Sequence, residues 1–185
     1  MFEEADATER QKDMERFFAD LDNETDRGMV LATGCYFDRL LKECLGSYFA
    51  EGKATDDLLA DGNGLGSFSA RNRCCLSLRI TEPLEYRTLK IMAGIRNKFA
   101  HTLRTDFTDS NIRDLTLEMA RCLFEEPIFE SLKLDRESPR RLFNLTAFCL
   151  NDKLWLRPLD THFHVADYPK NMPEHVANIL DDKIK

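Results

Sequence analysis

Apolar residues recur at every third or fourth position along most of this chain, and this spacing restricts the fold more than any other feature. One such stripe, in residues 24–49, consists of Val30, Phe37, Leu41, Cys44 and Tyr48. A second stripe, in residues 110–124, consists of Ile112, Leu115, Met119, Cys122 and Leu123. This period is typical of helices that bury one face, whereas the alternation typical of strands is almost absent. The sequence therefore predicts an all-α protein, built as a single helical bundle.

Capping residues and prolines divide this bundle into its helices. We expect helices over about 7–22, 24–49, 55–60, 67–79, 83–101, 110–124 and 138–157. The helix that starts at Pro83 should bury Leu84, Thr88, Ile91, Met92, Ile95 and Phe99, and the last helix should bury Leu142, Leu145, Phe148 and Cys149. Two glycines of the second helix, Gly28 and Gly34, indicate close packing against a neighbour.

The same signals indicate one domain followed by a tail. The helical bundle should occupy residues 1–158. Residues 159–185 read as an irregular C-terminal tail, which could pack on the bundle and contains one possible short helix over 173–181.

The charge of the chain argues against a large surface for nucleic acid. It carries 33 acidic and 26 basic residues, for a formal net charge of -7. Non-specific binding of nucleic acid requires clustered Lys and Arg, and no helix-turn-helix candidate presents a basic recognition face. We therefore expect no specific binding of duplex DNA by the chain alone.

No apolar run approaches the roughly 20 residues that a membrane-spanning helix needs. The first residues, Met1-Phe2-Glu3-Glu4, are acidic and lack the apolar core of a secretory signal. The expected location is cytoplasmic, with no membrane association.

The cysteines and histidines give only a weak signal for a metal. None of the six cysteines forms a C-x-x-C pair, and Cys35, Cys44 and Cys122 fall on apolar stripes, so we expect buried, reduced thiols. The run Asp160-x-His162-x-His164-x-x-Asp167 contains ligand types, but His162 and His164 would share a face only in an extended segment. We expect neither a metal site nor a cofactor, and a metal bound by this run is the lesser alternative.

Polar groups suited to chemistry gather at Arg96, Asn97 and His101. Asn97 and His101 are four residues apart and share a helix face. Arg96 and His101 are five apart, which places them about 140° from each other around a regular helix. They would converge only if the helix frays at His101, or if two chains meet about a two-fold axis, so the spacing favours a homodimer.

Two blocks of the sequence resemble the mannitol operon repressor family of bacteria. The blocks are Asn23–Leu45 and Gly66–His101, which includes G-S-F-S-A-R and R-N-K-F-A-H. The second block also fits the R-x4-H pattern of the wider HEPN superfamily of helical domains. The resemblance implies a HEPN-like all-α protein, and it directs attention to Asp26, Arg27 and Arg71 as binding residues.

The resemblance leaves three functions open. The first is a transcriptional regulator, a repressor that works through protein contacts without a DNA-binding module. The second is a metal-independent endoribonuclease of the HEPN type, which would bind RNA. In it Arg96 would stabilise the phosphorane, His101 would move a proton, and Asn97 would orient the imidazole. The third is a toxin-like or antitoxin-like partner protein.

A purely structural role for the same residues is also open. In that case Arg96 would pair with an acid of the second helix, such as Asp26, and His101 would cap a carbonyl. The negative charge of Glu24 would then stabilise the positive N-terminal end of the second helix.

Overall fold

The computed structural model describes residues 4–124 and 126–160, and every regular element in these ranges is helical. The elements are α1 (Glu4–Leu21), α2 (Asp26–Tyr48), α3 (Lys53–Leu59), α4 (Phe68–Ser77), α5 (Pro83–His101), α6 (Ser110–Leu123), α7 (Glu126–Ser131), the 3-10 turn η1 (Leu134–Arg136), α8 (Pro139–Leu154) and α9 (Arg157–Asp160). The prediction of an all-α bundle is confirmed. None of the described helices is both long and apolar enough to cross a lipid bilayer.

Local capping explains where most helices begin. Ser67 and Ser138 accept hydrogen bonds from backbone N–H groups in the first turns of α4 and α8. Glu82 and Glu85 form a reciprocal capping box at the start of α5. The cap of α2 is Thr25, whose hydroxyl accepts from the N–H of Gly28 at 3.0 Å.

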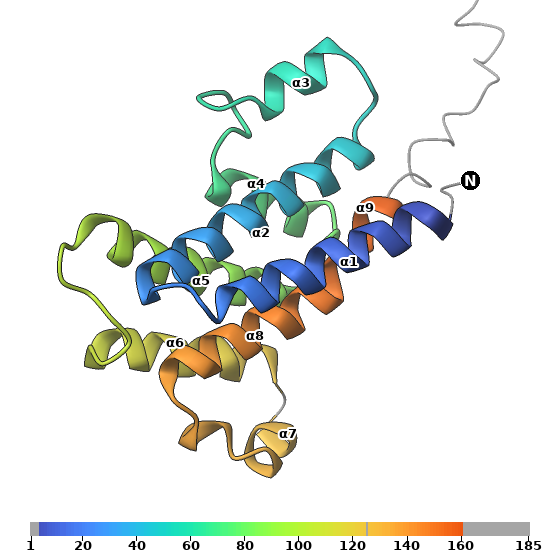
Figure 1. The fold of residues 1–185 in the computed structure, drawn as a ribbon. Coiled ribbons are helices and arrows are strands. Elements are labelled where there is room, and N and C mark those ends of the chain that lie inside the picture. Colours follow the sequence, from blue (N-terminus) through green and yellow to red (C-terminus); the bar gives the residue numbers. More distant parts are fainter. Residues whose placement is uncertain (1–3, 125, 161–185) are drawn as a thin grey trace, which may run out of the picture.

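Helix α2 is the central element, because it packs against α1, α3, α4, α5, α8 and α9. Figure 1 shows α1 lying along α8 and α2 on one side of the molecule, with α5 and α6 behind them. Phe37 of α2, Phe99 of α5 and Phe143 of α8 are completely buried. Phe107 joins two of them, since its ring centroid lies 5.5 Å from that of Phe99 and 5.6 Å from that of Phe143. One continuous core thus holds the long helices together.

The segment between α6 and α8 contains structure that the sequence analysis missed. Helix α7 and η1 cover a second apolar cluster, which consists of Ala120, Phe129, Leu134 and Leu142. Pro127 stands within the first turn of α7, where a proline is tolerated.

Several expected burial positions are wrong. Leu84 is 55% exposed, because Glu85 takes the inner side of the first turn of α5 and bonds to Arg157 of α9 at 2.8 Å. Phe148 is 41% exposed, since its ring meets Phe18 of α1 on one edge. Cys35 is exposed, although Cys44 and Cys122 are buried as expected.

The predictions made for the tail fall outside the described residues. They are the possible helix over 173–181, any packing of the tail on the bundle, and the ligand types at His162, His164 and Asp167.

Candidate functional site

Arg96 lies across α2 at Gly34. A Cβ atom built on Gly34 would stand 2.9 Å from Cγ of Arg96 and closer still to its Cδ. Glycine at position 34 therefore makes room for the aliphatic part of this arginine, as the expected close packing required. The residue as a whole is half-buried, and its guanidinium forms no hydrogen bond or ion pair with the residues that the structure describes.

Asn97 and His101 are both exposed on the outer side of α5. The helix remains regular through His101, and the N–H of Thr102 still donates to the carbonyl of Lys98 at 3.0 Å. The helix does not fray at His101, so the angular separation from Arg96 is that of a regular helix. Within one chain, the half-buried Arg96 and the exposed His101 lie on different sides of α5.

Asp26 pairs with Arg140, and the expectation that it would pair with Arg96 is wrong. Its Oδ1 accepts from Arg140 Nη1 at 2.6 Å, and its Oδ2 accepts from the backbone N–H of Phe107 at 3.1 Å. Arg140 also donates to the carbonyl of Glu24 at 2.6 Å. Asp26 therefore ties the start of α2 to α8 and to the connection between α5 and α6.

Arg27 caps the C-terminal end of α5. Its guanidinium donates to the carbonyl of Phe99, to that of Thr102 at 2.6 Å and to that of Leu103 at 3.1 Å. Helix C-termini leave carbonyls without partners inside the helix, and a cation there also meets the negative end of the helix dipole.

Arg71 is a buried structural cation. Only 2% of the residue is exposed, and Nη1 lies 2.7 Å from Oδ1 of Asp38. Its Nη2 donates to the carbonyl of Leu59 at 3.0 Å and lies 3.3 Å from Oδ1 of Asp61. Arg71 thus joins α4, α2 and the end of α3, where its fork can serve several acceptors at once.

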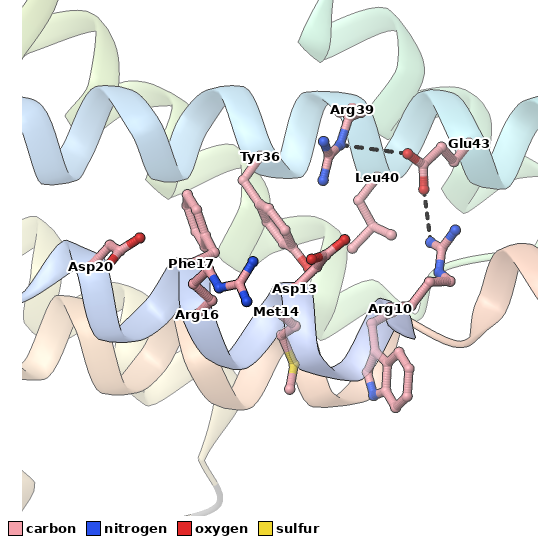
Figure 2. Close-up of a pocket in the computed structure, with 11 residues that line it drawn as sticks. Arg10, Asp13, Met14, Arg16, Phe17, Asp20, Tyr36, Arg39, Leu40 and Glu43 are labelled. Atoms are coloured by element: carbon pink, nitrogen blue, oxygen red, sulfur yellow. Dashed lines mark hydrogen bonds and ion pairs between the residues drawn. The ribbon is translucent and has the colours of Figure 1, made fainter. Parts of the chain in front are cut away.

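A groove between α1 and α2, which sequence analysis did not find, has a volume of about 490 Å³. Figure 2 shows its walls, which are lined by Arg10, Asp13, Met14, Arg16, Phe17, Asp20, Tyr36, Arg39, Leu40, Glu43 and Trp155. The rings of Phe17 and Tyr36 are stacked, with centroids 4.6 Å apart and planes at 14°. The groove forms only where residues of two helices meet, so no local pattern in the sequence predicts it.

Two polar side chains of this groove, those of Tyr36 and Glu43, already have partners within the chain. The Tyr36 hydroxyl donates to Oδ1 of Asn151 at 2.6 Å, and burial raises the pKa of Tyr36 to about 12. Glu43 lies 2.7 Å from Arg10 and 3.5 Å from Arg39. Both the tyrosine and this carboxylate are therefore engaged within the chain.

Within residues 4–124 and 126–160, no cluster of His, Cys, Asp and Glu is arranged to hold a metal ion. Burial raises the pKa of the Cys44 thiol to about 12 and raises that of Cys75 still further. Thiols with such pKa values stay protonated near neutral pH, so these two cysteines are not nucleophiles.

Comparison with known proteins leaves the family open. No protein-family model, no curated protein and no solved structure matches the chain. The described residues define a helical protein whose candidate residues divide into two groups. Asp26, Arg27 and Arg71 hold helices together, whereas Arg96, Asn97 and His101 have side chains that reach the surface.

Proposed function

We propose that this chain is a cytoplasmic transcriptional regulator of the mannitol operon repressor type, which acts through protein contacts without a DNA-binding motif of its own. One observation carries the proposal: the two blocks that resemble this family, residues 23–45 and 66–101, pack against each other as α2, α4 and α5. Their polar residues Arg27 and Arg71 join these helices and the segments beside them. What resembles the family is therefore one packed unit rather than two scattered matches.

The charge of the chain and its exposed leucines support contact with protein rather than with duplex DNA. The net charge of -7 opposes a broad contact with phosphates. Several large apolar side chains lie on the surface of the described residues, among them Leu103, Leu84 and Leu132, which are 95%, 55% and 56% exposed. These leucines belong to different segments of the chain, and each is available for contact with a protein partner.

A test of this function uses transcripts and DNA binding together. Deleting the gene from its host should change the transcripts of a small set of operons, and the wild-type gene should restore them. The purified chain should not shift duplexes from those promoters at nanomolar protein near physiological salt. A promoter-specific shift by the purified chain would contradict action through protein contacts, and unchanged transcripts would contradict a regulator.

A metal-independent endoribonuclease is the second candidate, and it is favoured by the free state of Arg96 and the exposure of His101. Because these two side chains lie on different sides of α5, this function requires a homodimer in which one copy supplies Arg96 and the other His101. Asn97, on the same face as His101, would orient the imidazole.

The nuclease candidate predicts cleavage of single-stranded RNA that survives chelator. His101→Ala and Arg96→Ala should each lower the rate by about 100-fold or more, because a general acid–base and a fixed cation are lost. Lys90→Ala, at an exposed position on the same helix, is the matched control. A monomer mass by light scattering at tens of micromolar, or no cleavage by wild type, would exclude this candidate.

A further inference from the structure

The groove between α1 and α2 is a surface for which the proposed function has no use. It has an aromatic and aliphatic floor, formed by Phe17, Tyr36 and Leu40, and charged groups along both sides (Figure 2). We propose that residues 173–185 of this same chain bind in the groove as an amphipathic segment, with its apolar side chains on that floor. The proposal does not depend on the regulatory function.

Chain length allows the segment to reach the groove. Trp155, at the end of α8, lines the groove and precedes the last described residues by only a few positions. Residues 161–172 can span up to about 40 Å when extended, at roughly 3.3 Å per residue. The wall of the groove from Arg10 to Asp20 is only about 15 Å long, at 1.5 Å per helical residue. The linker is thus longer than the groove wall, which is the length that the proposal requires.

The sequence of the segment matches the shape of the groove. Its apolar residues have the spacing i, i+3, i+4 and i+8, and they are Val176, Ile179, Leu180 and Ile184. As a helix, this stripe would be about 12 Å long, which fits the groove wall. An amphipathic helix laid with its apolar face in a groove is a recurring mode of peptide recognition.

The charges at the edges of the stripe also match. At 3.6 residues per turn, Asp181 borders one edge of the stripe and Asp182 borders the other. The groove presents arginines from both helices, among them Arg16 from α1 and Arg39 from α2 (Figure 2). Arg16 has no ion pair among the described residues, and Arg39, whose side chain is 69% exposed, lies 3.5 Å from Glu43 in an ion pair that solvent weakens. Each edge of the segment would therefore lie near a cation that is either unpaired or held only by an exposed ion pair.

A single fluorophore makes the proposal testable in the full-length chain. Trp155 is the only tryptophan, and it lines the groove. The double variant Ile179→Asp, Leu180→Asp places two charges on the apolar stripe, so the segment should leave the groove. Trp155 emission should then move to longer wavelength and be quenched more strongly by acrylamide. Asn178→Asp adds a charge on the opposite side of the stripe and should leave the emission unchanged.

A synthetic peptide of residues 173–185, added to the double variant, should restore the wild-type emission. Arg16→Glu in the double variant should weaken this binding, whereas Lys12→Glu, exposed on α1 but outside the groove, should not. Circular dichroism of each variant checks that the helices remain. Unchanged emission in the double variant, or failure of the peptide to bind it, would overturn the proposal. A difference in emission between wild type and the double variant that disappears when the protein is diluted would overturn the proposal as well. In that case the occupant of the groove would be the segment of a second copy.

Discussion

Arg96 of α5 crosses α2 at Gly34, where a Cβ atom would stand 2.9 Å from Cγ of the arginine. Arg96 is the one of the three candidate arginines, Arg27, Arg71 and Arg96, that has no partner among the described residues, and it packs against a residue without a side chain. Its head group reaches the surface while its stem packs on the backbone of α2.

We expect Gly34→Ala to have opposite effects in two backgrounds. In an Arg96→Ala chain it should stabilise by about 1 kcal/mol, because alanine favours a helix over glycine. In wild type the gain should be absent or reversed, since the new methyl group collides with Arg96. Urea denaturation of the four chains gives the coupling energy. Equal effects in both backgrounds would show that the two residues do not interact.

Loss of the Asp26 carboxylate should weaken the joint between α2 and α8. Asp26→Asn should destabilise the chain by about 2 kcal/mol, because a hydrogen-bonded ion pair with Arg140 and a bond to the N–H of Phe107 are disturbed. The free energy of unfolding measures this loss. The control is Asp114→Asn, whose side chain is 74% exposed and should change stability little. If the losses in the free energy of unfolding caused by Arg140→Ala and Asp26→Asn simply add in the double variant, the ion pair contributes nothing to stability.

Removing the Arg27 cap should loosen the end of α5 in particular. Arg27→Ala should destabilise by about 1 kcal/mol and speed hydrogen exchange of amides near residues 99–103, since three carbonyls lose their donor. Arg27→Lys should not restore protection, because an ammonium lacks the planar fork. Protection that stays at the wild-type level in Arg27→Ala would show that the cap is dispensable.

Stability should fall at alkaline pH because of the buried thiols. Burial raises the pKa of Cys44 to about 12, whereas an unfolded cysteine has a pKa of about 8.5. The unfolded chain therefore loses this proton first. Stability should be full below pH of about 8.5 and then decline up to about pH 12, by about 1.4 kcal/mol per pH unit for each such thiol.

Urea unfolding at a series of pH values checks this decline. Cys44→Ala should make it shallower, whereas Cys35→Ser, at an exposed position on the same helix, should leave it as in wild type. Stability that is constant from pH 8 to pH 10 would show that these thiols are not desolvated.

The described helices follow closely from the sequence, because helix formation depends on local features. The stripe from Val30 to Cys44 has a helical period, and Ser67 and Ser138 satisfy N–H groups only a few residues away. Close packing at Gly34 was also predictable, since a glycine inside a long helix needs a compensating contact. The identity of the contacting residue, Arg96, was not.

What only the tertiary structure decided is which groups meet. Asp26 binds Arg140, 114 positions away, and no spacing rule distinguishes that partner from Arg96. The period of a helix determines which residues share a face, but it does not determine which neighbour covers that face. Phe148 remains partly exposed on α8 for this reason, although its ring packs against Phe18 of α1. The groove between α1 and α2 has the same origin, since its walls come from two helices whose relative placement depends on the whole core.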